Sequence, residues 1–557
     1  MKFAMLQLNL VTGDICGNAA RIAEAVRAAA LSGADLCITP NHALCGVGPQ
    51  HMLTVDGFAE ACQNALHALA KELGNGPPVL AGSPMAALAP NDERICNAAV
   101  LLKDGKLAVA ARMTFNFNEQ TDASMDQGLC CGMVTLLGRR LGVLLCDERR
   151  EDALFRQMQK AHAYTPLKTL IMKGMDALVH LGATPFTTGI HELREQRLSR
   201  VASRHHLHLF SSNVVGGNGG DVYHGQSLCF GPTGALLGLG RMFGEDCVVI
   251  DVSTSEGSQH PACACREEQV WGALRLGLRD YVRKSGFEGV LLGLSGGLDS
   301  AVVAAIAVDA LGRENVLGVL LPSPWTSEDS TRYAAELAEN LGIERMELPI
   351  APLMQGYADA LNAAFAVFPK PARTSTESTE ENIQPRIRGH LLMALANKYG
   401  LLLLNTSNKS ETAMGYSTLY GDTAGALAVI GDVHKSGVYK LARWYNERRE
   451  LSVIPEGVIR RAPSAELRPG QLDTDSLPPY DILDPLLARI MGEDLLPELP
   501  ADDGEQCDPV LFGELYRKMR TTEFKRRQCP PVLRISRRVF CRDWGLPLVS
   551  RYSMPEK

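Results

Sequence analysis

The residues best suited to chemistry in this 557-residue chain form the loop Ser-Gly-Gly-Leu-Asp-Ser at positions 295–300. An apolar, strand-like run precedes the loop, and the helix-like run AVVAAIAV follows it. Glycines at such a turn let backbone N–H groups and the positive end of the helix face an anion. The hydroxyls of Ser295 and Ser300 can donate to phosphate oxygens, and Asp299 can hold the Mg²⁺ ion that accompanies them. The pattern is neither a Walker A motif nor a dinucleotide fingerprint, and it predicts phosphate binding.

A second reactive group is Cys146, which ends the strand-like run LGVLLC. A thiol there can act as a nucleophile when a base and a cation accompany it. The other cysteines of the 15 are scattered, many in apolar runs, which is typical of reduced thiols rather than a disulfide framework. The clusters Cys130–Cys131 and Cys263–Cys265 lack the paired spacing of a zinc site.

The elements that must position these residues form two α/β alternations joined by a polar linker. Residues 1–253 alternate strand-like and helix-like runs, which predicts a layered α/β domain. Residues 254–266 break the pattern and are the expected linker. Residues 267–557 begin a second alternation, which predicts a parallel sheet, with a helix at 328–341 and a mobile loop at 369–381.

Composition narrows the classes of function. With 56 basic and 63 acidic residues, 46% hydrophobic and 21% charged, the chain is an ordinary globular protein of net charge −7. This excludes general disorder and a strongly basic nucleic-acid binder. No apolar run reaches the roughly 18 residues of a membrane span, and the first residues lack the features of a signal peptide. We therefore expect a cytoplasmic protein.

Further motifs in the second half accompany the SGGLDS loop. They are EENIQPRIRG (380–389), NTSNKSETAMGYSTLYGD (405–422), PSAEL (463–467), LPPYD (477–481) and EFKRRQ (523–528). In order and spacing this set resembles the NAD⁺ synthetases, which belong to the N-type ATP pyrophosphatases. The resemblance implies a doubly wound parallel sheet. It also implies an enzyme that adenylates nicotinic acid adenine dinucleotide with ATP and Mg²⁺, and then amidates it to NAD⁺.

The resemblance also implies roles for individual residues. ATP would contact Gly293, Leu294, Ser295, Gly296, Gly297, Leu298, Asp299, Ser300 and Thr406. The deamido dinucleotide would contact Asn382, Glu411 and Lys525. Two anions must meet in the reaction, so cations are needed. Asp299 and Glu411 are the expected Mg²⁺ ligands, and Lys435 is a candidate phosphate contact.

The first half carries weaker motifs: MLQLNLVTGDICGNAARI, LGVLLCDE, GATPF and NVVGGNGGDVYHGQS. They resemble the nitrilase-like amidohydrolase domain that is fused to the synthetase in glutamine-dependent NAD⁺ synthetases. The resemblance implies an αββα sandwich. It also implies a glutaminase with Cys, Glu and Lys, whose ammonia passes to the synthetase.

Only one member of that triad is present. Cys146 matches the nucleophile, but Asn41 stands where the family has its Glu, and no Lys occurs from 107 to 159. An amide cannot take up a proton, and the nearby Arg112 is a poor proton donor. The sequence therefore predicts ammonia as the nitrogen donor.

Alternatives remain open. Glutamine could still be hydrolysed by Cys146 with His42 or Glu119 as a substitute base. The first half could instead be a non-catalytic binding or oligomerisation module, within an expected homo-oligomer. The chain could also be another adenylating amidotransferase, or a hydrolase that uses Cys146 on a different amide.

Overall fold

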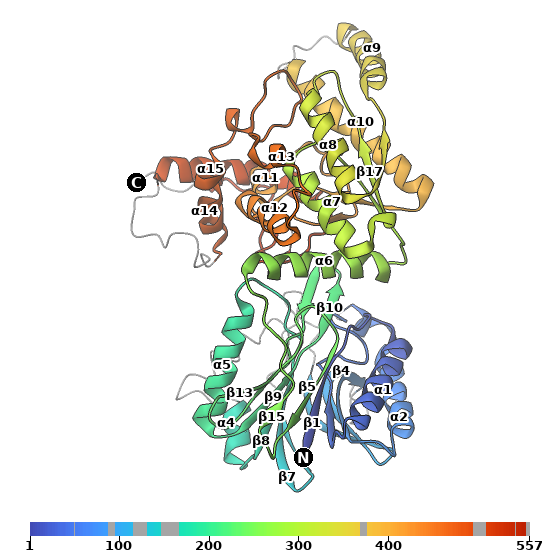
Figure 1. Cartoon of the computed structure of the whole chain (residues 1–557), viewed down its shortest axis with the longest axis vertical. Helices are drawn as coiled ribbons and strands as arrows, with labels where there is room; N and C mark the ends of the chain where they lie inside the picture. Colours follow the sequence, from blue (N-terminus) through green and yellow to red (C-terminus); the bar gives the residue numbers. More distant parts are fainter. Residues whose placement is uncertain are drawn as a thin grey trace. The chain divides into compact units, whose positions relative to one another are not determined.

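A computed structural model describes residues 1–49, 51–86, 95–114, 131–145, 166–367, 376–493, 508–540 and 542–552. The chain divides into two compact units, residues 1–264 and 265–557 (Figure 1). Each unit is an α/β layered structure with its own core, so each is described by itself.

The first unit contains two large sheets. The seven-stranded sheet has the order β15-β14-β1-β2-β3-β4-β5 and the six-stranded sheet has the order β13-β12-β9-β8-β7-β6. The strands of the first sheet are β1 (Lys2–Gln7), β2 (Leu36–Ile38), β3 (Val79–Ala86), β4 (Ile95–Lys103), β5 (Lys106–Thr114), β14 (Asp246–Asp251) and β15 (Glu256–Gly257). Those of the second are β6 (Cys131–Leu136), β7 (Arg139–Leu145), β8 (Ala177–Leu181), β9 (His208–Ser212), β12 (Leu228–Phe230) and β13 (Leu236–Leu239). A separate hairpin pairs β10 (Val215–Asn218) with β11 (Asp221–His224).

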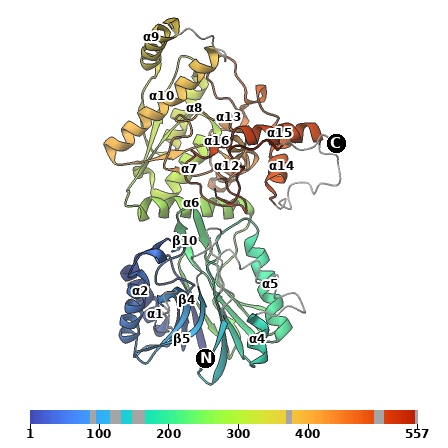
Figure 2. The same cartoon turned by 180° about the vertical axis from the view of Figure 1, so that it is seen from behind.

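Helices cover the outer face of each sheet. Helices α1 (Ile15–Leu31) and α2 (Phe58–Glu72) lie on the first sheet, and α4 (Pro166–Met172) and α5 (Ile190–His205) lie on the second (Figures 1 and 2). Strand β1 illustrates how the layers are held together, because its side chains pack into the core on each face of the sheet. Successive side chains of a strand point to opposite faces, so Ala4 and Leu6 pack toward the helices while Phe3 and Met5 pack between the sheets. The predicted αββα sandwich is confirmed.

The second unit is built on one parallel sheet with the order β18-β17-β16-β19-β20. Its strands are β16 (Val290–Gly293), β17 (Val316–Leu320), β18 (Glu344–Glu347), β19 (Leu402–Asn405) and β20 (Leu427–Ala428). The chain runs outward from β16 to one edge and then returns to β19 on the other side of it. Such a reversal is a topological switch point, where the carboxyl ends of two neighbouring strands leave a crevice.

The helices of this unit flank the sheet and extend beyond it (Figure 2). They are α6 (Arg266–Lys284), α7 (Leu298–Leu311), α8 (Glu328–Leu341), α9 (Ala351–Val367), α10 (Thr376–Tyr399), α11 (Lys409–Met414), α12 (Lys435–Arg449), α13 (Glu456–Arg460), α14 (Tyr480–Met491), α15 (Pro509–Thr521) and α16 (Glu523–Arg526). Helices α14 and α15 lie on the opposite side of the unit from α10 in both views. The predicted doubly wound α/β fold is confirmed.

Two expectations from the sequence meet the structure differently. Helix α8 has the predicted bounds, because Ser327 caps it and Gly342 ends it in the left-handed conformation that favours glycine. The predicted mobile loop at 369–381 is wrong over residues 376–381, which form the first turns of α10.

The cysteines in the described ranges are all free thiols. Among the described residues, no helix is long and apolar enough to cross a bilayer.

Candidate functional site

The SGGLDS loop joins the carboxyl end of β16 to the first turn of α7. Its last residue, Ser300, is buried, and the hydrogen bonds of its hydroxyl are made to other residues of the loop. The Ser300 hydroxyl donates to the carbonyl of Gly297 at 3.1 Å, accepts from the N–H of Ser295 at 3.3 Å, and lies 3.0 Å from the Ser295 hydroxyl. Ser300 therefore shapes the loop, while its glycines and Ser295 face the crevice.

Gly296 is required by two independent features of this loop. Its backbone has φ 75°, a region that side chains other than glycine rarely adopt. A Cβ atom there would lie 2.1 Å from the carbonyl oxygen of Ser330, at the start of α8. Only glycine allows the loop and α8 to approach so closely.

Asp299 faces the first turn of α11, which follows the neighbouring strand β19. The Asn408 side chain caps α11 in a reciprocal capping box with Glu411. The Asn408 amide also donates to Asp299 at 3.0 Å. The capping box fixes Glu411 on the side of α11 that faces the loop, so two carboxylates from helices that follow different strands share the crevice.

Lys435, the first residue of α12, supplies the cation between them. Its ammonium donates to Asp299 and lies 3.4 Å from Glu411. Burial and the charge of Asp299 raise the pKa of Glu411 above its usual range. Burial opposes protonation of Lys435, but the two carboxylates still raise its pKa. The site concentrates charge that a further cation would help to balance.

These residues fit a magnesium ion held together with phosphates. Mg²⁺ is commonly bound by one or two carboxylates plus substrate oxygens, and Asp299 and Glu411 supply such a pair. In the described part of the chain, no group of three or more His, Cys, Asp or Glu side chains is arranged for a metal. The protein thus offers two carboxylate ligands and leaves the other positions around the ion to phosphate oxygens and water, which suits an ion that binds together with a nucleotide.

A cavity of about 340 Å³ opens at this switch point. Of the residues that the sequence assigns to ATP, the cavity lining includes Gly293, Leu294, Ser295, Gly296, Gly297, Leu298, Asp299 and Thr406. Glu411 and Lys435 line it as well. The sequence did not single out Arg388, Asp422 or Glu466, which also line it and come from the quoted motifs. Their place in those motifs was the available signal.

The structure brings the other two residues assigned to the dinucleotide onto one turn beside the cavity. Asn382 accepts a hydrogen bond from the Thr418 hydroxyl at 2.7 Å. The Lys525 ammonium donates to the carbonyls of Gly415 and Ser417 at 2.8 and 2.7 Å. Neither lines the cavity. They come from α10 and α16, so the turn at 415–418 is where these distant segments meet.

In the corresponding region of the first unit, the described residues place two buried amides against each other. Asn41 is fully buried, and its side chain accepts from the Asn97 amide at 2.9 Å. Its backbone N–H donates to the carbonyl of Gly182, which follows β8. A Cβ at Gly82 would lie 2.8 Å from the Asn41 Cα, so the backbone also packs tightly here. Sequence reasoning missed Asn97, because nothing in the run ERICNAAV marks it as facing Asn41.

Of the side chains considered as substitutes in this region, the structure describes His42 and Arg112. His42 has φ 55°, and its Nδ1 lies 4.0 Å from the sulfur of Cys45. Burial lowers the pKa of His42 to about 4. Arg112 is exposed, on the face of β5 opposite Ala111, which packs in the core between the sheets. Cys146, Glu119 and Cys130 lie outside the described residues.

A buried polar cluster missed by the sequence analysis lies on the neighbouring strands. The His180 ring lies 2.9 Å from the Ser211 hydroxyl, which also accepts from Arg194 at 3.2 Å. Burial, aided by Arg194, lowers the pKa of His180 to about 3, so the imidazole is neutral. Arg194 is 2% exposed. The sequence could not predict this burial, because Arg194 is a charged residue in a helix whose pattern is typical of a protein surface.

Together these features define a two-domain protein in which a nucleotide-binding α/β unit follows a carbon–nitrogen hydrolase sandwich. Comparison with family models agrees with both parts. The NAD synthase model matches residues 270–529, and the carbon-nitrogen hydrolase model matches residues 2–259.

Relatives cover nearly the whole chain. The chain is 39% identical to a glutamine-dependent NAD(+) synthetase of Synechocystis sp., over 99% of this chain and 98% of that one. It is 36% identical to one of Thermotoga maritima, with 100% and 99% covered. A glutamine-dependent NAD+ synthetase structure from Acinetobacter baumannii, in complex with ADP, superposes with a TM-score of 0.73 at 30% identity and 98% coverage of both chains. The chain belongs to the glutamine-dependent NAD⁺ synthetase family and is an ATP-dependent ligase.

Proposed function

We propose that this chain activates the free carboxylate of nicotinic acid adenine dinucleotide with ATP and then converts it to the amide of NAD⁺. In the first step the carboxylate attacks the α-phosphate, and pyrophosphate leaves. In the second step ammonia attacks the acyl-adenylate carbon, AMP leaves, and the nitrogen loses a proton. The observation that carries this proposal is the cavity that joins the SGGLDS loop to Glu411, Lys435 and Thr406.

The residues of the cavity suit this chemistry. The loop N–H groups and Ser295 bind phosphate oxygens, and Lys435 lowers the repulsion between the two anions. Asp299 and Glu411 would hold Mg²⁺, which supplies positive charge to the phosphates. Asn382 and Lys525 would act through the turn at 415–418, where the deamido dinucleotide would lie beside ATP.

We further propose that ammonia is the nitrogen donor. A glutaminase needs a base for its thiol and a cation for the tetrahedral oxygen. Asn41 occupies the base position, is fully buried and accepts from Asn97, and an amide takes up no proton at neutral pH. Among the described residues, Arg112 is the cation nearest in sequence to the expected Lys position, and it is exposed on the face of β5 opposite the buried Ala111.

Glutamine is the second candidate donor, and the names of the relatives favour it. In that case Cys146 would attack the amide, with His42 or Glu119 as the base. Because the pKa of His42 is lowered to about 4, it lies about 4.5 below the ordinary thiol pKa of about 8.5, so proton transfer from the thiol to His42 is unfavourable. The first unit would otherwise serve as a binding or oligomerisation module of a cytoplasmic homo-oligomer.

The decisive experiment measures NAD⁺ formation from the deamido dinucleotide and ATP, with ammonia and with glutamine compared. Loss of acid–base help alone lowers a rate by about 10²–10⁴-fold. We therefore expect synthesis with ammonia and no more than about 1% of that rate with glutamine. Cys146→Ala should leave the ammonia-dependent rate unchanged. Glutamate release that matches NAD⁺ formation and disappears in Cys146→Ala would contradict ammonia as the donor and establish the glutamine alternative.

A further inference from the structure

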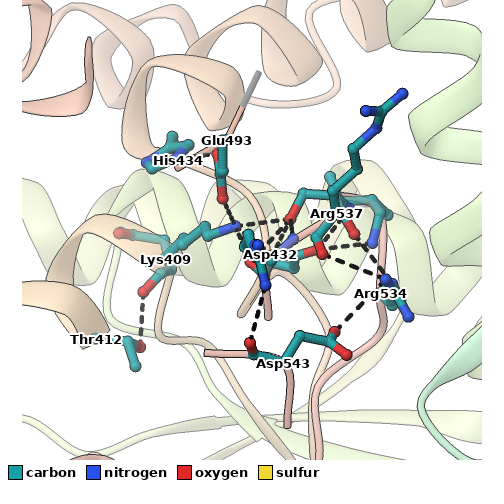
Figure 3. Close-up of polar contacts among 12 residues, drawn as sticks. Lys409, Thr412, Asp432, His434, Glu493, Arg534, Arg537 and Asp543 are labelled. Atoms are coloured by element: carbon teal, nitrogen blue, oxygen red, sulfur yellow. Dashed lines mark hydrogen bonds and ion pairs between the residues drawn. The ribbon is translucent and has the colours of Figure 1, made fainter. Parts of the chain in front are cut away.

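The first residue of α11, Lys409, is completely buried and does not line the cavity. Figure 3 shows the polar contacts around it. Its ammonium donates to Asp432 at 2.6 Å and also to Glu493. Two further acceptors are the Ser536 hydroxyl at 2.8 Å and the Arg538 carbonyl at 2.7 Å. Four acceptors surround three N–H groups, so the charge is fully compensated despite its burial.

The partners of Lys409 come from three segments that are distant in the sequence. Asp432 lies in the loop before α12, Glu493 follows α14, and Ser536 lies in the carboxyl-terminal part of the chain. Asp432 is itself fixed from the other side, because its second oxygen accepts from the N–H groups of Ile535 and Ser536 at 2.8 and 2.7 Å. The ammonium thus joins four parts of the second unit at one point.

The same network reaches the start of α12. His434 is the N-cap residue of this helix, and its Nε2 lies 3.3 Å from Glu493. Burial raises the pKa of Glu493, but His434 and Lys409 outweigh it and lower that pKa to about 2, so the carboxylate is ionised. A bond between the two helices adds to this, since the Ser410 hydroxyl accepts from the Lys435 N–H at 3.0 Å.

The network therefore lies directly behind the charged groups of the cavity. Lys409 is two residues before Glu411 on α11, and His434 directly precedes Lys435 on α12. Both pairs share a single helical turn, so a displacement of Lys409 or His434 moves Glu411 or Lys435. Replacing a buried ion pair by apolar groups is often neutral for stability, so overall stability alone gives no reason for a charge here.

We infer that Lys409 is a positioning residue: with Asp432, Glu493 and His434 it fixes the first turns of α11 and α12, so that Glu411 and Lys435 engage a magnesium nucleotide together. This inference rests on the proposed function only for the assignment of Glu411 to the metal. Groups that orient metal ligands from behind commonly change metal affinity or activity by about 10–100-fold when they are altered.

The test compares Lys409→Met and Glu493→Gln with the wild-type chain. Glu493→Gln keeps the shape of a side chain that is 11% exposed, so it preserves the fold even if Lys409→Met does not. The probe is ADP, titrated by calorimetry with and without Mg²⁺, and the readout is the ratio of the two affinities. We expect each variant to lower this ratio by about tenfold or more, with ADP binding in the absence of Mg²⁺ unchanged.

Lys284→Met is the matched control, because Lys284 lies 3.6 Å from Asp280 on α6, outside the cavity. It should lower the melting temperature without changing the Mg²⁺ ratio. A merely structural role for Lys409 would likewise lower the melting temperature and the bound fraction but keep the ratio. A folded Glu493→Gln variant, or a folded Lys409→Met variant, whose ratio stays within about twofold of wild type overturns the inference. A wild-type chain that makes no NAD⁺ contradicts the proposed function instead, since ADP binding needs neither the dinucleotide nor ammonia.

Discussion

The two units place comparable residues at comparable points of their folds and treat them in opposite ways. In the second unit, Asp299 and Glu411 follow neighbouring parallel strands and share a cavity with Lys435. In the first unit, Asn41 follows β2 and contacts Asn97, with Gly82 packed against its backbone. One region holds opposed charges around an open volume, whereas the other holds neutral amides in close packing.

The difference shows how a ligand-binding site can be distinguished from a buried core region of neutral side chains. Glu411 is partly buried beside another carboxylate, which raises its pKa, and a bound cation would relieve this unfavourable energy. Asn41 and Asn97 are neutral amides joined by one hydrogen bond, so this pair carries no net charge. Binding a cation would therefore relieve an electrostatic cost in the second unit, whereas the amide pair of the first unit presents no charge to a cation.

The largest expected effect comes from removing the charge of Asp299. Asp299→Asn keeps the shape of the side chain but loses the proposed metal ligand and the charged partner of Lys435. We expect the turnover of NAD⁺ synthesis to fall by about 100-fold or more with either nitrogen donor. Asp309→Asn, at the other end of α7, is the matched control and should stay within about twofold. A turnover of Asp299→Asn above about a tenth of wild type would show that the metal assignment is wrong.

A smaller effect is expected at the turn beside the cavity. Lys525→Ala removes two charge-assisted hydrogen bonds to the carbonyls of Gly415 and Ser417. A charge-assisted contact between the lysine and a bound anion commonly contributes about 1.5–3 kcal/mol, which is about 10–160-fold in an apparent affinity. The KM for the deamido dinucleotide should rise by this factor, and the KM for ATP should rise less. Lys518→Ala, which removes a lysine bonded to the carbonyl of Ser476, should change neither KM. Equal changes in both KM values for Lys525→Ala would contradict a role toward the dinucleotide.

The smallest effect concerns the stability of the first unit. The pKa of His42 is lowered to about 4, so between pH 6.5 and about 4 the unfolded chain binds a proton that the folded chain does not. Stability is therefore lost as the pH falls through this window, by up to about 1.4 kcal/mol per pH unit. His42→Asn, which tolerates the positive φ, should flatten this slope in calorimetric melting. His67→Asn, at an exposed position on the surface of α2, is the matched control for this measurement. An unchanged slope for His42→Asn would place the ring in a solvated environment.

Local sequence chemistry was sufficient for the phosphate loop and for the helices around it. The SGGLDS loop could be predicted because its signals are local: an apolar run before it, two glycines within it and a helix after it. The loop indeed lies between β16 and α7. The bounds of α8 follow from Ser327 and Gly342 for the same reason. The order of the motifs then indicated which residues meet at the cavity, as Asp299, Thr406 and Glu411 do.

Contacts that join distant segments could not be predicted in this way. Lys409 has the appearance of a solvated charge in NTSNKSE, yet it is buried because Glu493 and Asp432 surround it. Asn97 faces Asn41 only because β4 and the segment after β2 lie at the same end of the sandwich. The start of α10 was mistaken for a loop because its Ser- and Thr-rich composition outweighed helix formation in the prediction. Burial depends on tertiary neighbours, which one sequence does not reveal.

The contact between Lys409 and the Arg538 carbonyl spans 129 residues and has a consequence for how the protein is made. At about 5–20 residues per second, the ribosome needs several seconds to supply the far end of this contact after Lys409 emerges. During that time the first unit already has all of its own strands, while α11 carries a lysine without its final partners. Premature termination before residue 535 would leave a complete sandwich joined to a nucleotide site whose Lys409 lacks its contacts with Ser536 and Arg538.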